Sequence, residues 1–125
     1  MILVVDDNRD LRDMICLLLA EMGHQTTVAS NGKEAIQWLL ASHLPNVILL
    51  DLTMPVMDGY QFLAAREVDP ALMQVPVVVM SAVHEYAALL GRYWISASVS
   101  KPPCTRTLGQ AIERALLSGP AAGQA

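Results

Sequence analysis

The sequence predicts an α/β fold of the doubly wound class, with a five-stranded parallel sheet covered by helices on both faces. Short apolar runs alternate five times with segments of helical periodicity. The runs are almost continuously apolar, as expected of parallel strands that are buried on both faces. With 125 residues, of which 54% are hydrophobic, the chain supplies one substantial core and leaves little room for a second.

The five predicted strands are short, and valine and isoleucine dominate three of them. Right-handed crossovers between parallel strands place the connecting helices on the two faces of the sheet. Only its position after the other four supports the fifth strand. The predicted strands span residues 2–5, 26–29, 47–50, 75–80 and 97–100.

The predicted helices are recognised by apolar residues that repeat at helical spacing. In the first helix this repeat runs from Leu11 to Leu19, and Gly23 marks the end of the helix. The pair Asp69–Pro70 is expected to end the third helix. We predict one domain over residues 1–118 and a flexible tail over 119–125. The helices are expected at residues 11–19, 33–41, 59–68, 85–93 and 105–117.

Composition excludes several kinds of partner. Eight basic against twelve acidic side chains give a net charge of −4, which argues against binding to a nucleic-acid backbone. No apolar run approaches the roughly 18 residues of a membrane span, and no basic segment precedes the first apolar run. Cys16 and Cys104 lie too far apart for a metal or redox motif. We expect a soluble, cytoplasmic protein with no direct nucleic-acid or membrane partner.

Reactive side chains follow four of the five predicted strands. Asp6 and Asp7 end the first strand, Asp51 the third, Ser81 the fourth and Lys101 the fifth. Taken singly, each is expected to be a turn, capping or solvated residue. However, the carboxyl ends of parallel strands meet at one edge of a sheet, where doubly wound proteins bind their ligands. The sequence therefore predicts that these five side chains form one site.

Three carboxylates at one edge of a sheet need a counter-charge. Two like charges about 4 Å apart repel by roughly 4 kcal/mol at an effective dielectric constant of ~20. Because the candidate ligands are all oxygens, a hard divalent ion such as Mg²⁺ is favoured. Lys101 adds a fixed positive charge, and Ser81 adds a hydroxyl. This combination is typical of sites that handle a phosphoryl group.

Four segments, in this order along the chain, resemble the receiver domain of two-component response regulators. The resemblance covers essentially the whole chain, and the stretch from residue 51 to residue 59 is its most specific part. It implies the flavodoxin-like strand order 2-1-3-4-5. The segments are Val5-Asp6-Asp7-Asn8, Asp51-Leu52-Thr53-Met54-Pro55-Val56-Met57-Asp58-Gly59, Met80-Ser81-Ala82 and Lys101-Pro102.

The resemblance implies that Asp51 accepts a phosphoryl group from a histidine kinase or a histidine phosphotransfer protein. It also implies a Mg²⁺ cofactor held by carboxylates and by one backbone carbonyl. The implied ligands are Asp6, Asp7, Asp51 and the carbonyl of Thr53. Such a domain is a signalling domain rather than an enzyme, although it promotes its own phosphorylation and dephosphorylation.

Further residues are implied to contact the phosphoryl group itself. Lys101 would pair with its oxygens, while the Ser81 hydroxyl and the backbone N–H of Ala82 would donate hydrogen bonds to it. The Lys101–Pro102 peptide bond would be cis. Members of the family often dimerise or bind effectors through the face formed by their fourth helix, fifth strand and fifth helix.

One departure from the family pattern leaves an alternative open. Ser98 stands three residues before the lysine, where family members usually carry Tyr or Phe. The chain is therefore also compatible with a receiver-like interaction module that acts without phosphorylation. A phosphatase of the haloacid dehalogenase type would need Asp at position 53, where Thr53 stands. Flavin binding is a weaker alternative, because no phosphate-cradling loop follows the first strand.

Overall fold

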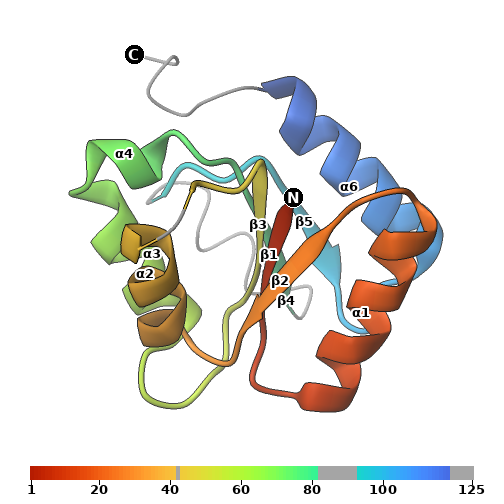
Figure 1. Cartoon of the computed structure of the whole chain (residues 1–125), viewed down its shortest axis with the longest axis horizontal. Helices are drawn as coiled ribbons and strands as arrows, with labels where there is room; N and C mark the ends of the chain where they lie inside the picture. Colours follow the sequence, from red (N-terminus) through yellow and green to blue (C-terminus); the bar gives the residue numbers. More distant parts are fainter. Residues whose placement is uncertain (42, 82–92, 119–125) are drawn as a thin grey trace.

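The computed structural model describes residues 1–41, 43–81 and 93–118. Its five strands form one sheet in the order β2-β1-β3-β4-β5, and every neighbouring pair is parallel. Both the predicted class and the strand order are confirmed (Figure 1). The strands are β1 (Ile2–Val5), β2 (Thr26–Ala29), β3 (Val47–Asp51), β4 (Val77–Ser81) and β5 (Ala97–Ser100).

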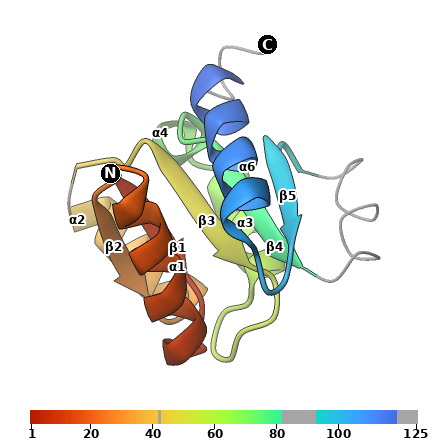
Figure 2. The ribbon, with the colours of Figure 1, turned by 90° about the vertical axis from the view of Figure 1, so that its right-hand side faces the viewer.

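Helices cover both faces of this sheet. One group packs on one face and a second group on the other, and the two perpendicular views show this arrangement (Figures 1 and 2). The first pair is α1 (Arg9–Glu21) and α6 (Thr105–Ser118). The second group is α2 (Gly32–Ala41), α3 (Gly59–Glu67) and α4 (Pro70–Met73).

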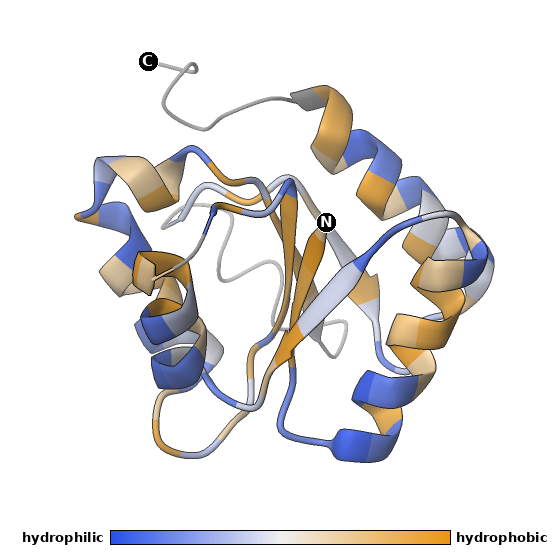
Figure 3. Ribbon diagram, in the orientation of Figure 1, coloured by the Kyte–Doolittle hydropathy of each residue, from blue (hydrophilic) through white to orange (hydrophobic). Residues whose placement is uncertain are grey.

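Alternate residues of the strands enter two separate cores, one on each face. In β1, Leu3 and Val5 pack with Phe62 of α3, whereas Ile2 and Val4 pack on the side of α1 and α6. Figure 3 shows the apolar strands at the centre and polar residues on the outer sides of the helices. Burial on both faces explains why β1, β3 and β4 are almost continuously apolar rather than alternating.

The structure corrects two local predictions. The fourth strand begins at Val77 instead of residue 75 and includes Ser81. The pair Asp69–Pro70 not only follows α3 but also begins the short helix α4, which the sequence analysis missed. The Asp69 side chain accepts hydrogen bonds from the N–H groups of Ala71 and Leu72, and proline suits the first position of a helix because it has no N–H to leave unpaired.

Other predictions lie at the edges of what the structure describes. Most of the predicted helix at 85–93 and the whole predicted tail at 119–125 fall outside the described residues. The Lys101–Pro102 peptide bond is cis, as the resemblance implied. Among the described residues, no helix combines the length and the apolar character needed to cross a membrane.

Arg66, in the last turn of α3, is a fully buried cation. Its guanidinium donates hydrogen bonds to the carbonyl oxygens of Val75 (2.8 Å) and Trp94 (3.0 Å). It also lies 5.5 Å from the centroid of the Trp94 ring. The neighbouring Glu67 side chain accepts a hydrogen bond from the backbone N–H of Trp94. Burial lowers the pKa of Arg66 to about 10. Arg66 therefore ties the end of α3 to the segments that lead into β4 and β5.

We expect Arg66→Ala to lower the free energy of unfolding by about 3 kcal/mol or more. The substitution leaves two carbonyl groups without their donor, at about 1–3 kcal/mol each, and opens a cavity. Chemical denaturation measures this loss. Arg106→Ala is the control, because Arg106 is exposed on α6. A loss below about 1 kcal/mol for Arg66→Ala would show that these hydrogen bonds contribute little to stability.

Candidate functional site

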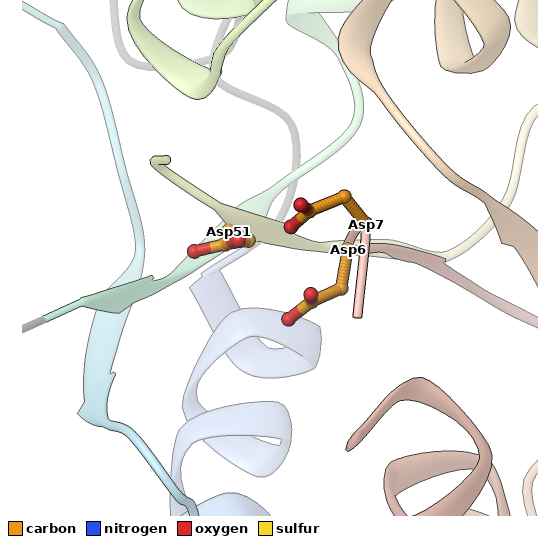
Figure 4. A group of neighbouring side chains, drawn as sticks. All are labelled: Asp6, Asp7 and Asp51. Atoms are coloured by element: carbon orange, nitrogen blue, oxygen red, sulfur yellow. The ribbon is translucent and has the colours of Figure 1, made fainter. Parts of the chain in front are cut away.

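Parallel strand register brings the predicted acids together at the carboxyl edge of the sheet. Val5 of β1 pairs with Leu50 of β3, so the residues that follow them, Asp6 and Asp51, leave the sheet at the same level. One carboxylate oxygen from each of Asp6, Asp7 and Asp51 lies within 4.8 Å of the others. Figure 4 shows the three side chains close together at the ends of β1 and β3.

Two of these carboxylates are buried. Asp6 is 0% exposed and Asp51 is 2% exposed, whereas Asp7 lies at the surface. Burying an ionised carboxylate is costly unless charged or hydrogen-bonding partners compensate for the lost water. The arrangement therefore requires positive charge close to Asp6 and Asp51.

Lys101 supplies that charge from the end of β5. Its Nζ lies 2.9 Å from Oδ1 of Asp51 and 3.5 Å from Oδ2 of Asp6. Ser81 pairs with Ser100 in the β4–β5 register, and the backbone N–H of Lys101 donates to the Ser81 carbonyl at 3.4 Å. The sheet therefore delivers the lysine to the two buried acids.

Burial and the neighbouring charged groups both shift the pKa values of Asp51 and Lys101. Burial raises the pKa of Asp51 above its usual value of 3.8; the hydrogen bond from Lys101 opposes this rise, and the charge of Asp6 adds to it. Burial alone would lower the pKa of Lys101, but the hydrogen bond with Asp51 and the charges of Asp51 and Asp6 raise it. The contact with Lys101 is thus not sufficient to return the pKa of Asp51 to its usual value of 3.8.

The residues at this edge fit a hard divalent cation. Oδ2 of Asp51 is buried and accepts no hydrogen bond from any of the described residues, and the buried Oδ2 of Asp6 has only its 3.5 Å contact with Lys101 Nζ. Unpaired buried carboxylate oxygens are costly, and coordination of a cation is one way to satisfy them. Because the donors are all oxygens, with carboxylates predominating, the set suits Mg²⁺.

The other predicted site residues lie close by. Met80 pairs with Asp51 in the β3–β4 register, so Ser81, which is buried, follows one residue beyond the level of Asp51. Thr53 is exposed, and its backbone N–H approaches Oδ1 of Asp51 at 3.4 Å. Ala82 lies outside the described residues. Four of the five predicted strand-end side chains, those of Asp6, Asp7, Asp51 and Lys101, lie together, and the strand register places Ser81 at the same edge of the sheet.

Close backbone packing shapes the segment that follows Asp51. The N–H of Gly59 donates to the carbonyl of Leu52, and a Cβ atom at position 59 would lie 2.6 Å from the carbonyl oxygen of Asp51. Only glycine fits this approach without moving the backbone. Asp58 then begins α3 with a capping box completed by Gln61. The beginning of α3 is therefore hydrogen-bonded to Leu52 and packed closely against the backbone of Asp51.

The turn between Asp51 and α3 contains one strained residue. Val56 has a φ of 70°, and the N–H of Met57 donates to the carbonyl of Pro55 at 2.8 Å, which closes a γ-turn. A β-branched residue rarely adopts this conformation. The N–H of Gly32 donates to the carbonyl of Met57 at 2.9 Å, so the beginning of α2 holds the turn in place.

Two residues beside the acids have roles that the sequence analysis did not assign. Asn8 caps α1 with its side chain, and its backbone N–H donates to Oδ1 of Asp6 at 2.8 Å. Nη1 of Arg12 donates to the backbone carbonyl of Asp6 at 3.1 Å. An asparagine just before a helical repeat is a capping signal in sequence. Nothing in the local pattern marks the contact of Arg12.

The family is established by comparison with known proteins. The pattern of the response regulator receiver domain matches residues 2–113. The chain therefore belongs to the response regulator receiver domain family.

Individual relatives agree with this assignment. The regulatory protein AtoC of Escherichia coli (strain K12) is 38% identical over 84 residues, which are 67% of this chain and 18% of AtoC. The response regulator Rre1 of Synechocystis is 35% identical over 82 residues, which are 65% of this chain and 35% of Rre1. The chain thus spans less than two thirds of the length of these relatives.

Solved structures share the fold over nearly the whole chain. The receiver domain of NtrX from Brucella abortus has a TM-score of 0.82 and 28% identity, and the match covers 95% of this chain and 100% of that one. The signal receiver domain of a signal transduction histidine kinase from Syntrophus aciditrophicus has a TM-score of 0.83 and 27% identity. That match covers 94% of this chain and 89% of the other.

We expect Asp51→Asn to raise the midpoint of thermal unfolding by a few degrees in metal-free buffer at neutral pH. The folded pKa of Asp51 lies above its unfolded value of 3.8, so folding disfavours the ionised carboxylate. The stability gained by the variant is largest above the folded pKa of Asp51 and disappears as the pH falls below 3.8. Thermal melts of both proteins across this pH range measure the difference.

Lys101→Met is the complementary variant, because it leaves Asp6 and Asp51 without their counter-charge. It is expected to lower the unfolding midpoint, since removing one partner of a buried ion pair is destabilising. If Asp51→Asn instead lowered the unfolding midpoint at neutral pH, the proposal that the ionised Asp51 carboxylate destabilises the folded state would be wrong.

Proposed function

We propose that the chain is a phosphoacceptor signalling domain, in which Asp51 takes a phosphoryl group from a histidine kinase or a histidine phosphotransfer protein. One observation carries this proposal. A buried carboxylate, Asp51, contacts Lys101 at 2.9 Å and lies within 4.8 Å of two further carboxylates. A carboxylate nucleophile beside a lysine, with further carboxylates that could bind a metal cation, suits phosphoryl transfer.

In the proposed reaction, a carboxylate oxygen of Asp51 attacks the phosphorus of a phosphohistidine. The new O–P bond forms as the P–N bond breaks, and the imidazole nitrogen keeps the electron pair and takes up a proton. The product is an acyl phosphate on Asp51. Lys101 stabilises the charge of the transferring group, because its Nζ already lies beside Oδ1 of Asp51. Later attack by water on the same phosphorus breaks the O–P bond to Asp51, releases inorganic phosphate and returns the free carboxylate.

The domain would promote both steps in itself without acting as an enzyme on other substrates. Mg²⁺, when bound, would neutralise charge on the phosphoryl oxygens and help to align them with the nucleophile. The residues proposed to hold it are Asp6, Asp7, Asp51 and the backbone carbonyl of Thr53. The buried Oδ2 of Asp51, which accepts no hydrogen bond from the described residues, and the closeness of the three carboxylates support this set. The Ser81 hydroxyl and the Ala82 N–H are proposed to donate hydrogen bonds to the phosphoryl group.

Phosphorylation is proposed to change the binding of a partner. We also propose that the reaction takes place in the cytoplasm, with no direct role for nucleic acid or membrane. The proposed dimer or effector face is formed by β5, α6 and the predicted helix at 85–93. A cavity of about 620 Å³ between β5 and α6 supports this face, and its lining includes Ser98, Ala111 and Arg114.

The same cavity favours a second candidate function. Ser98, the residue that replaces the usual aromatic side chain, lines it. A receiver-like module could bind its partner there without phosphorylation. The complete set of strand-end groups, from Asp6 to Lys101, makes this the weaker candidate.

Intact mass spectrometry tests the proposal directly. We expect the native chain, incubated with acetyl phosphate and Mg²⁺, to gain the mass of one phosphoryl group. Asp51→Asn should gain none, and neither should the native chain when EDTA removes the metal. If the native chain gained no mass and bound no beryllofluoride in the presence of Mg²⁺, the phosphoacceptor function would be wrong and the interaction module would be favoured.

A further inference from the structure

We propose that Arg12 is a positioning residue for the acidic cluster formed by Asp6, Asp7 and Asp51. It would orient Asp6 and Asp7 by holding the peptide bond between them. This inference rests on the proposed Mg²⁺-dependent function. The carbonyl oxygen of Asp6, which accepts the hydrogen bond from Nη1 of Arg12 at 3.1 Å, belongs to that peptide bond. The contact therefore acts on both acids at once.

The two acids depend on the backbone to different degrees. The Asp6 carboxylate is fully buried, accepts a hydrogen bond from the Asn8 N–H and lies 3.5 Å from Lys101. The Asp7 carboxylate is at the surface, yet it reaches the same cluster (Figure 4). A surface side chain loses conformational freedom when it is held in one direction. The direction of Asp7 therefore depends strongly on the plane of the Asp6–Asp7 peptide bond.

The environment of Arg12 supports a role beyond solubility. Its side chain is half-buried, and its Nε atom is buried without a hydrogen-bond partner among the described residues. A guanidinium is costly to remove from water, and its donors are normally satisfied. Arg9, one turn earlier in α1, is exposed and pairs only loosely with Asp13 at 3.9 Å. The Arg12 guanidinium is thus partly removed from water where it contacts the backbone carbonyl of Asp6.

Arg12 has two effects on cation binding, and they have opposite signs. As a positive charge near the acids, it repels a divalent cation, so its removal would tighten Mg²⁺ binding. As a donor to the Asp6–Asp7 peptide bond, it holds the ligands in place, so its removal would weaken Mg²⁺ binding. Partners that orient metal ligands typically change metal affinity by about 10- to 100-fold when they are mutated. The sign of the change therefore separates the two effects.

The test is an equilibrium Mg²⁺ titration of the unphosphorylated chain, followed by backbone amide NMR shifts. We expect Arg12→Met to weaken Mg²⁺ binding by about 10-fold. Arg12→Lys, which keeps the charge and one flexible donor, should fall between this variant and the native chain. Arg9→Met is the matched control, since it removes the same charge from the same helix without touching the acids. It should bind Mg²⁺ within about twofold of the native chain.

Mg²⁺ binding by Arg12→Met that is as tight as native binding, or tighter, would overturn the proposal. If Arg12→Met does not fold in thermal melts, Arg12→Lys decides alone: affinity several-fold below native supports the proposal, and native affinity overturns it. If the native chain itself binds no Mg²⁺, the proposed function fails together with this inference. If the native chain binds Mg²⁺ and Arg12→Met binds it with the same affinity, only the proposed role of Arg12 is wrong.

Discussion

The contact of Lys101 with Asp51 and Asp6 is the interaction on which the rest of the site depends. Three carboxylates meet at one edge of the sheet, and two of them are buried. Such a cluster would repel itself strongly without positive charge. Lys101 supplies one charge from the end of β5, and the buried outer oxygens of Asp6 and Asp51, only one of which contacts Lys101, suit a second, divalent charge. The fold thus holds a binding site at a cost to its own stability.

Much of this arrangement could be predicted from the sequence, because it follows from chain order and periodicity. Continuous apolar runs identify parallel strands, and the carboxyl ends of parallel strands must share one edge. These two rules place Asp6, Asp51 and Lys101 together before any coordinates are known. The strand order β2-β1-β3-β4-β5, which the structure confirms, came from the family resemblance rather than from periodicity.

The sequence could not reveal contacts that join distant segments or depend on a single side chain. The short helix α4 was missed because four residues are too few to show a helical repeat. An arginine within α3 gives no local sign that it will be buried and will reach the carbonyls of Val75 and Trp94. Arg12 follows the pattern of an ordinary helical surface residue, yet its guanidinium reaches the backbone of Asp6.

In the folded chain the ionised carboxylate of Asp51 is destabilised by burial and by Asp6, and a divalent cation should relieve this destabilisation. Carbon-13 NMR titration of the Asp51 side-chain carboxyl group, assigned by comparison with Asp51→Asn, measures its pKa with and without the cation. We expect a pKa above 3.8 for the Asp51 carboxyl in metal-free buffer and a lower pKa when Mg²⁺ is added. A metal-free pKa at or below 3.8, or a pKa that does not respond to Mg²⁺, would contradict this expectation.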